Sequence, residues 1–262
     1  MGRVPVVGNL AMVIEDEQEL VGGNTSDSVV RIGGTVRKPW HPTSGAVQNF
    51  MQALRSHGVD TPEPLGRDAE NRHVVEYLAG VTALDSLPLS LDDLRRVGRL
   101  VRQIHDASEH IPLPEVDDWN LPLPTAEPDL MCHNDLAPWN LIIGERWVFI
   151  DWDGAGPSTR LWDLAYAAQA FGSLFEGQPI DDAAANLRAF IDGYDASSEL
   201  RQALPDAMSK RTTAMYELLK RSHETGFQPW ANMYADGHGE HWRAAADYVD
   251  RHHGVWKQAL ER

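Results

Sequence analysis

The segment from His133 to Asp153 constrains this chain more than any other part of the sequence. Asp135 is followed five residues later by Asn140, and Asp151 comes eleven residues after Asn140. Pro138 lies between the first two, and proline is disfavoured inside a helix because it lacks an amide donor and clashes with the preceding turn. Asp135 and Asn140 are therefore expected on one loop.

Two apolar runs follow this loop and are expected to form a hairpin. Leu141–Ile143 and Trp147–Ile150 flank Gly144-Glu145-Arg146, a pattern typical of two strands joined by a tight turn. A hairpin doubles the chain back on itself. Asp151, at its end, is therefore predicted to return beside Asn140, at its start.

An Asp, an Asn and a second Asp gathered at one point indicate phosphoryl transfer. That reaction needs a carboxylate to orient the attacking hydroxyl, and an amide and a second carboxylate to hold magnesium against the phosphates. Oxygen ligands from Asn140 and Asp151, completed by phosphate and water, suit Mg²⁺, which seldom takes an all-protein cage. The alternative is an ordinary loop and hairpin whose polar residues cap turns. The ordered set, with a hairpin inside it, favours the metal–phosphate site.

Three stretches carry a family resemblance. His133-Asn134-Asp135 through Asn140, Ile150-Asp151-Trp152-Asp153 and Trp162-Asp163-Leu164-Ala165 resemble the aminoglycoside phosphotransferase and choline kinase superfamily, distant relatives of protein kinases. Matching features run from about Leu20 to about Ala168, and the last third of the chain carries no motif that we can match.

The resemblance implies a role for each residue of these stretches. Asp135 would be the catalytic base, and Asn140 and Asp151 would bind magnesium. His133 would be a structural member of the loop. Asp163 would brace the catalytic loop rather than react. Asp153 is a possible auxiliary residue with no assigned role.

Length and composition fit an ordinary globular protein. The 262 residues suffice for one large domain or two lobes with a substantial core. The first 15 residues lack the pattern of a signal peptide, and no run approaches a membrane span. The single cysteine, Cys132, rules out an internal disulfide and fits a cytoplasmic location. We expect it to be a buried, unreactive residue of the strand before the loop.

The charge distribution bears on partners. A formal net charge of −16 argues against a nucleic-acid surface, which needs clustered Lys and Arg. No Lys or Arg occurs between Arg102 and Arg146, whereas acidic residues are frequent there. Acid around an active site would attract a cationic substrate. An acidic surface that serves only solubility is the equally weighted alternative.

The N-terminal region is expected to cover the nucleotide. Predicted strands over Glu19–Asn24 and Ser28–Ile32 are joined by a loop through Gly22–Ser26. Glycine lets backbone amides approach phosphate oxygens, so Gly23 is a candidate nucleotide-binding residue. The alternative is a plain turn.

Gly33-Gly34 predicts a two-residue turn that pairs Val29–Ile32 with Thr35–Lys38. The resemblance requires a basic residue on the third strand, where it holds the α- and β-phosphates. Arg37 shares the more apolar face of this hairpin, as a nucleotide-covering surface should. We therefore predict that Arg37 contacts phosphate, with Lys38 as the second choice; the alternative is that both are solvated edge charges.

One departure from the family pattern concerns the following helix. Kinase-type folds usually place a Glu on it to pair with the strand cation. The helix predicted at about 45–57 contains Gln48 and Asn49 but no Asp or Glu. Either another carboxylate substitutes, or the cation contacts phosphate without that partner.

The stretch from His73 to Gly80 resembles the hinge of the superfamily. By that resemblance, the carbonyl of Glu76 and the amide of Leu78 would bond the adenine edge. The alternative is a simple buried strand.

The rest of the chain is expected to be mainly helical. Ser90 predicts the start of a helix over 90–107 with an apolar stripe, and further helices are predicted over 182–194, 200–224 and 240–260. The region 227–256 is rich in Trp, Tyr and His, which suits a pocket for an amphipathic ligand, although such aromatics are more often core. The histidines show no spacing typical of a zinc site.

The predicted fold is α/β and protein-kinase-like, with two lobes. Residues 1–78 would form a small, sheet-dominated N-lobe with the phosphate loop and hinge. Residues 79–262 would form a larger, mainly helical C-lobe with the catalytic loop, metal site and substrate pocket. ATP or GTP, with Mg²⁺, would lie between the lobes.

The expected activity is transfer of the γ-phosphoryl group to a hydroxyl of a small, cationic molecule, first of all an aminoglycoside-type antibiotic, which would make the chain a resistance enzyme. Two alternatives stay open. One is a kinase of another antibiotic, a choline-like amine, a sugar or a biosynthetic intermediate. The other is a catalytically idle immunity protein that binds a nucleotide or toxin. No nucleic acid or membrane partner is expected.

Overall fold

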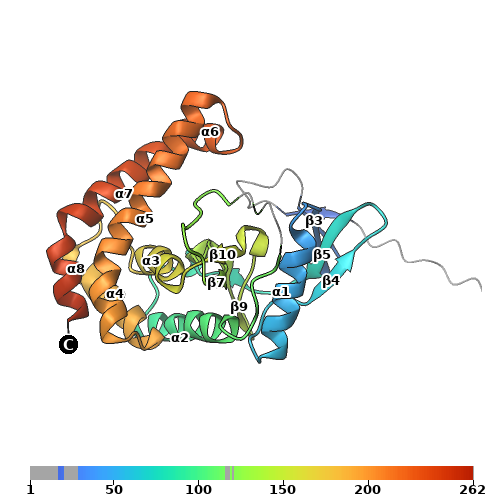
Figure 1. The fold of residues 1–262 in the computed structure, drawn as a ribbon, viewed down its shortest axis with the longest axis horizontal. Coiled ribbons are helices and arrows are strands. Elements are labelled where there is room, and N and C mark those ends of the chain that lie inside the picture. The colour runs from blue at the N-terminus through green and yellow to red at the C-terminus, as the bar shows by residue number, and fades with distance from the viewer. Residues whose placement is uncertain (1–16, 21–28, 116–118, 120, 262) are drawn as a thin grey trace, which may run out of the picture.

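The computed structural model describes residues 17–20, 29–115, 119 and 121–261, and Figure 1 shows two unequal parts. We call the smaller part, with strands β1–β5 and helix α1, the N-lobe, and the larger part, from β6 onward, the C-lobe. The expected two-lobed α/β fold is confirmed. The lobe boundary after residue 78 stays a prediction.

The N-lobe is built on an antiparallel sheet with the strand order β1-β2-β3-β5-β4. The predicted turn at Gly33-Gly34 joins β2 to β3 and sets Val30 opposite Arg37 and Ile32 opposite Thr35. The expected hairpin register is therefore correct. The five strands are β1 (Gln18–Glu19), β2 (Val30–Ile32), β3 (Thr35–Pro39), β4 (Pro64–Arg67) and β5 (Arg72–Glu76).

Helix α1 (Ser44–Ser56) lies within one residue of its predicted bounds. Val47, Phe50 and Leu54 recur at helical spacing and are buried in the main core. The Phe50 ring lies 5.8 Å from the ring of Trp152 in the C-lobe, in an edge-to-face arrangement. This contact ties α1 to the segment that follows the predicted hairpin.

Short strands at the centre of the C-lobe carry the loop predicted to be catalytic. One sheet has the order β6-β8-β9, and β7 pairs with β10 in a second, two-stranded sheet. The strands are β6 (Val81–Thr82), β7 (Leu130–Cys132), β8 (Leu141–Ile143), β9 (Trp147–Phe149) and β10 (Gly156–Ser158).

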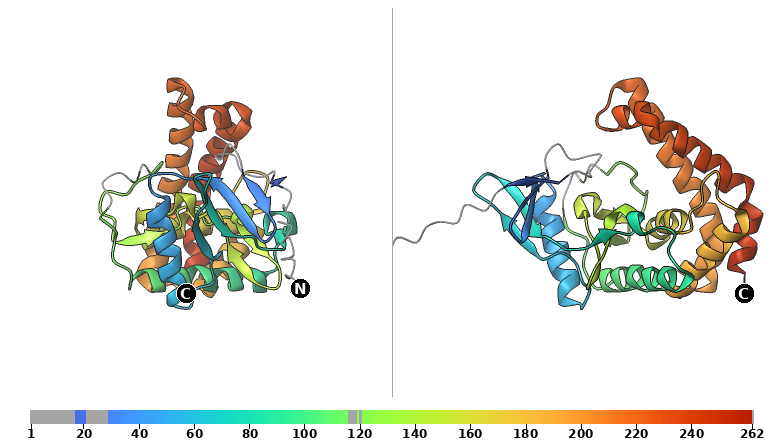
Figure 2. Two further views of the ribbon diagram at one scale, coloured as in Figure 1. Left: turned by 90° about the vertical axis from the view of Figure 1, so that its right-hand side faces the viewer. Right: turned by 180° about the vertical axis from the view of Figure 1, so that it is seen from behind.

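Helices surround these strands (Figures 1 and 2). Helix α2 begins as predicted after Ser90, whose side chain accepts from the amide of Asp93 while the Asp93 carboxylate accepts from the amide of Ser90. Helix α2 packs against α4, and α5 packs against α3 and α7. We call α5, α6 and α7 the arm, since they extend away from the rest of the C-lobe in all three views. The helices are α2 (Leu91–Ser108), α3 (Arg160–Phe171), α4 (Ile180–Tyr194), α5 (Ser198–Thr225), α6 (Trp230–Met233), α7 (Gly239–Arg251) and α8 (His253–Leu260).

The single helix predicted over 240–260 is wrong, because the chain breaks at His252 into α7 and α8. The indole of Trp256 donates to the carbonyl of Val249 at 3.0 Å. That carbonyl would accept from the amide of His253 in an uninterrupted helix. A side chain therefore replaces a backbone donor at the break, which helical periodicity does not reveal.

One hydrophobic core runs from α1 of the N-lobe to α8 at the C-terminal end. Its largest fully buried side chains include Trp152, Trp256 and Tyr194. Within the described part of the chain, no helix combines the length and the apolar character needed to cross a bilayer.

Candidate active site

The predicted hairpin is present and brings Asp151 back to Asn140. Strands β8 and β9 pair with Leu141 opposite Phe149, and the amide of Ile150 donates to the carbonyl of Asn140 at 2.8 Å. Asp151 is the next residue along the chain. The two predicted metal ligands therefore leave neighbouring backbone positions at one end of the hairpin.

Asp135 and Asn140 are in direct contact. The side-chain nitrogen of Asn140 donates to the Asp135 carboxylate at 2.8 Å and to the Asp135 carbonyl at 3.0 Å. This use of the nitrogen leaves the amide oxygen of Asn140 as a cation ligand. Burial raises the pKa of Asp135, although hydrogen bonds from Tyr166 and Asn140 act in the opposite direction. A carboxylate held in this way has a fixed direction and increased basicity.

Asp151 lies beside a buried lysine. It has left-handed backbone angles (φ 59°, ψ 61°). Lys38 Nζ lies 3.1 Å from an Asp151 oxygen and 2.7 Å from an Asp153 oxygen. Burial alone would lower the pKa of Lys38, but the two carboxylates outweigh it and raise that pKa. The charge of Lys38 in turn lowers the pKa of Asp151, so this ligand is ionised at neutral pH.

The donor chemistry of Asn140 and Asp151 fits a magnesium ion. Asn140 offers a neutral oxygen, and Asp151 offers an ionised carboxylate whose side chain is 37 % exposed. A cavity of about 300 Å³ lies next to this point and is lined by the N-lobe residues 41–44 and Val47, together with Trp119 and Asp153. The site therefore lies where the lobes meet.

The structure places Lys38, and not Arg37, beside Asp151; which of the two contacts phosphate stays a prediction. Arg37 donates to the hydroxyl of Thr35 and lies 3.3 Å from Asp68, a residue of the N-lobe itself. Lys38, the second choice, faces Asp151 across the lobe junction. The hairpin register was correct, and the face that reaches Asp151 is the one that carries Lys38. The apolar count of a strand does not reveal carboxylates that arrive from more than 100 residues away.

His133 holds the loop, as the resemblance implied. Its Nε2 donates to the carbonyl of Ile150 at 3.0 Å, and its Nδ1 accepts from the amide of Asp135 at 3.3 Å. The pair of contacts fixes which nitrogen carries the proton. His133 is fully buried, and its ring lies 4.5 Å from that of Trp152. It therefore links the start of the loop to the end of the hairpin.

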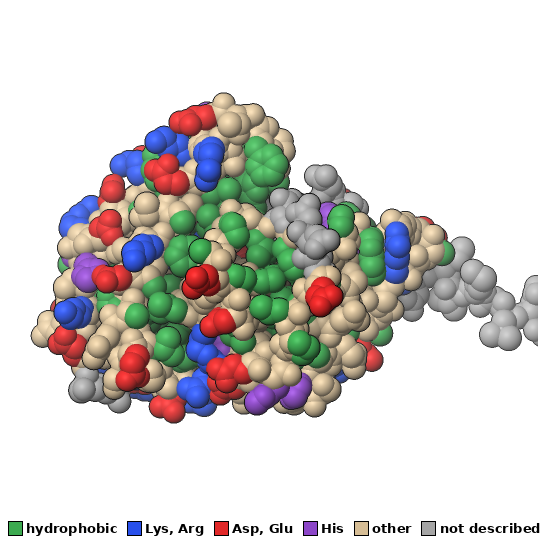
Figure 3. Space-filling view, viewed as in Figure 1, with side chains coloured by type: hydrophobic (Ala, Val, Ile, Leu, Met, Phe, Trp, Pro, Cys, Tyr) green, Lys and Arg blue, Asp and Glu red, His purple; other side chains and the backbone are tan. Residues whose placement is uncertain are grey.

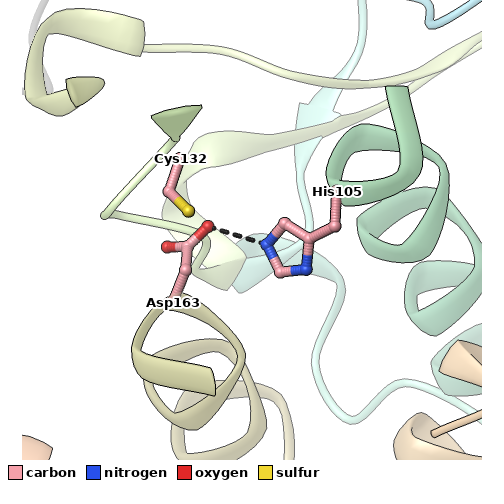
Figure 4. Close-up of side chains that lie close together, drawn as sticks. All are labelled: His105, Cys132 and Asp163. Carbon is pink, nitrogen blue, oxygen red and sulfur yellow. Dashed lines mark hydrogen bonds and ion pairs between the residues drawn. The ribbon is translucent and has the colours of Figure 1, made fainter. Parts of the chain in front are cut away.

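Asp163 of α3 also braces the loop, and Figure 4 shows its contact with His105. It accepts from the amide of Asn134 at 2.9 Å and from His105 Nε2 at 3.1 Å. Asn134 has a left-handed backbone (φ 65°), so this hydrogen bond holds a strained turn directly before Asp135. His105 Nδ1 lies 2.8 Å from the Tyr194 hydroxyl, which extends the brace to α4.

One potential ligand atom from each of His105, Cys132 and Asp163 lies within 4.8 Å of the other two (Figure 4). The ring nitrogens of His105 and both oxygens of Asp163 are engaged in hydrogen bonds. Burial raises the pKa of the Cys132 thiol well above its usual value, so the thiol is protonated at neutral pH. As expected, Cys132 is buried on the strand that leads into the loop.

Two residues near Asp135 were missed by sequence reasoning. Tyr166 follows Asp163 by three positions on α3, so it shares the face that meets the loop. That spacing was a usable signal. Arg211 of α5 is buried, lies 4.4 Å from the Tyr166 ring and donates to the carbonyl of Asn134 at 3.4 Å. Nothing in the local sequence marked it.

An aromatic cluster adjoins the loop. Tyr166 stacks on Trp242 of α7, with ring centres 6.1 Å apart and planes at 17°, and Trp139 of the loop lies 6.5 Å from Tyr166. Trp139 is 39 % exposed. Figure 3 shows apolar side chains gathered on this face below the arm. Further apolar residues pack with this cluster: Met215, Leu218 and Leu219 of α5, Trp230 of α6, and Tyr234 directly after α6.

The remaining predicted nucleotide contacts are placed only in part. Gly23 lies outside the described residues. Glu76 ends β5, and Leu78 follows in the connection to β6. The amide of Tyr77 between them donates to Gly34 at 2.9 Å, which fixes this connection against the β2–β3 turn. That the Glu76 carbonyl and the Leu78 amide contact adenine stays a prediction.

Comparisons with known proteins agree with this geometry. Residues 114–200 match the model of the phosphotransferase enzyme family. No curated protein matches the chain. The fold resembles that of a choline/ethanolamine kinase family protein from Mesorhizobium loti, with 19 % identity, 95 % of each chain covered and a TM-score of 0.60.

Two further solved structures share the fold. The amicoumacin kinase hAmiN, in complex with AMP-PNP, Ca²⁺ and amicoumacin, has 14 % identity over 90 % of this chain and 88 % of that chain, with a TM-score of 0.64. A spectinomycin phosphotransferase in complex with ADP and spectinomycin has 13 % identity over 94 % and 92 %, with a TM-score of 0.52. The superfamily resemblance inferred from the sequence is confirmed.

Proposed function

We propose that this chain, which has the kinase-like fold and matches the phosphotransferase enzyme family over residues 114–200, transfers the γ-phosphoryl group of ATP or GTP to a hydroxyl of a small molecule. One observation carries the proposal. The Asp135 carboxylate is 2.8 Å from the Asn140 amide, and the hairpin returns Asp151 beside Asn140. A base and two cation ligands thus meet at the lobe junction.

In this mechanism Asp135 accepts a hydrogen bond from the substrate hydroxyl and takes its proton as the new oxygen–phosphorus bond forms. The bond between the γ-phosphorus and the bridging oxygen of the nucleotide breaks in line. Asn140 and Asp151 would hold magnesium, which neutralises charge on the phosphates when bound. Lys38, in place of Arg37, would contact the phosphates from the N-lobe.

The substrate is proposed to be a hydroxylated amine, with aminoglycoside-type antibiotics first among the candidates and antibiotic resistance as the consequence. The acidic composition favours a cation, and the Trp139 ring, which is 39 % exposed on the loop that carries Asp135, offers a surface on which an ammonium group or a sugar ring can rest. Choline, ethanolamine and amicoumacin are the next candidates, from the names of the similar structures.

An idle nucleotide- or toxin-binding protein is the second candidate, because α1 has no Asp or Glu to pair with the strand lysine. Phosphate transfer from ATP or GTP to a panel of hydroxylated amines separates the two. Asp135→Ala should reduce turnover at least about a hundredfold, the usual contribution of a general base, with nucleotide affinity retained. Glu127→Gln, an exposed acid before β7, is the control and should leave both unchanged. Unchanged turnover in Asp135→Ala would refute the assignment of the base.

A further inference from the structure

Lys38 is a buried cation that needs a fixed counter-charge. Its side chain is 8 % exposed, and an unpaired buried ammonium group is strongly disfavoured. Helix α1, which packs beside the sheet, has no acidic residue to offer. Both carboxylates that meet Lys38 come instead from the segment directly after β9.

The two carboxylates differ in their surroundings. Asp151 follows the Asn140–Ile150 hydrogen bond and is the more exposed, at 37 % against 25 % for Asp153. Asp153 makes the shorter contact with Lys38, 2.7 Å against 3.1 Å. Both therefore contact the lysine, Asp153 at the shorter distance and Asp151 with more of its side chain exposed.

Trp152 fixes this division between its two neighbours. Its side chain is 1 % exposed, and its indole donates to the carbonyl of Phe149 at 2.9 Å. Its ring also packs against Phe50 of α1. Because Trp152 is anchored, the short 3₁₀ turn Trp152–Gly154 holds Asp153 against the N-lobe.

His73 closes the other side of Asp153 without competing for it. It lies opposite Lys38 in the sheet, and its Nδ1 is 3.8 Å from an Asp153 oxygen. Burial, then the charge of Lys38, lowers the pKa of His73 to about 4, so the ring is neutral near pH 7. Among the described residues near Asp153, Lys38 is thus the charged partner of this carboxylate.

We propose that Asp153 is a positioning residue that replaces the missing carboxylate of the N-lobe helix: it holds the Lys38 ammonium group at the phosphates and so leaves Asp151 to the magnesium ion. The inference rests on the proposed function, since it assigns Lys38 to the nucleotide. Without Asp153, Lys38 would pair with Asp151 alone and compete with the cation for that carboxylate.

A double-mutant cycle with Asp153→Asn and Lys38→Met tests this role. The readout is the Kd of a fluorescent, non-hydrolysable ATP analogue, titrated at several magnesium concentrations. Asp153→Asn should weaken binding about tenfold and raise the magnesium concentration needed, as expected for the loss of one charge-assisted hydrogen bond. In the Lys38→Met background, Asp153→Asn should have no further effect. Asp68→Asn, which removes an N-lobe carboxylate paired with Arg37 and Arg72, is the matched control and should leave the Kd unchanged.

Equal losses from Asp153→Asn in both backgrounds would overturn the proposal, because Asp153 would then contact the magnesium or nucleotide directly. The wild type, the two single variants and the double variant are also compared by thermal unfolding without nucleotide. Additive changes in Tm would equally overturn the proposal. If the wild-type protein binds no nucleotide, the proposed function fails. Coupling in Tm would then still report whether Asp153 holds Lys38.

Discussion

Three carboxylates around the loop have three different surroundings, and these decide what each can do. Asp135 is held by Asn140 and Tyr166, and burial raises its pKa, as suits a base. Asp151 faces a lysine that lowers its pKa, as suits a cation ligand. Asp163 is fully buried and accepts two hydrogen bonds, which suits a brace. The residue type is the same in each case, and the environment assigns the role.

His73 is expected to make the protein acid-sensitive. Its pKa lies at about 4 in the folded protein and at 6.5 in its unperturbed state, so the unfolded chain binds the proton first. Stability should therefore fall as the pH decreases from about 6.5 towards 4, by at most about 3 kcal/mol from this residue at about 1.4 kcal/mol per pH unit. His73→Phe should flatten the dependence of the unfolding free energy on pH in this range. His110→Asn, at an exposed histidine, should not; equal slopes for wild type and His73→Phe would contradict the expectation.

At the scale of elements, one hairpin and one helix position the site. The β8–β9 hairpin sets Asp151 beside Asn140, and helix α3 presents Asp163 and Tyr166 from one face. The α2–α4 pair supports them, because Tyr194 of α4 is hydrogen-bonded to His105 of α2, and His105 is hydrogen-bonded to Asp163. The precision of the loop therefore depends on how closely these helices approach.

Gly98 allows the close approach of α2 to α4. A methyl group at this position would lie 2.1 Å from the carbonyl oxygen of Phe190 and 2.6 Å from the amide nitrogen of Tyr194, so the helices would have to separate. Gly98→Ala should lower stability by about 1–3 kcal/mol and Tm by several degrees. Gly254→Ala on α8, where nothing lies within 4 Å, is the matched control and should be neutral or stabilising. Equal Tm values for both variants would show that the helix contact is not limiting.

At the scale of the whole molecule, the site exists only where the lobes meet. Lys38 comes from the N-lobe sheet, and Asp151 and Asp153 come from the C-lobe. The Phe50–Trp152 contact joins α1 to the same segment. A nucleotide with magnesium would therefore bridge both lobes and stabilise the folded protein as a unit.

Magnesium and ATP analogue together should raise Tm more than either alone. At a ligand concentration a hundred times the Kd, the gain is about 2.7 kcal/mol, or roughly 5–10 °C for a protein of this size. Asp151→Asn should keep the fold but lose the magnesium-dependent part of the shift. A shift that is the same with and without magnesium would contradict the assignment of Asn140 and Asp151 as its ligands.

Local pairing explains why the central part of the site could be predicted from the sequence. Asp135, Asn140 and Asp151 lie within 17 positions, and one hairpin is enough to bring them together. The helices followed from periodicity and caps, as Ser90 shows, although the break at His252 depended on a side chain beyond the local pattern. The β2–β3 register followed from the glycine turn. Which strand cation reaches Asp151 did not follow from it.

The sequence by itself determined the hairpin, the helices and the three polar residues at the loop, because their geometry depends on neighbours along the chain. Tertiary structure decided which cation meets them and what holds them in place. Lys38 reaches Asp151 across 113 positions, and Arg211 reaches the carbonyl of Asn134 across 77. Such partners are selected by the burial of charge within the folded protein, and a buried charge takes the counter-charge that packing brings to it.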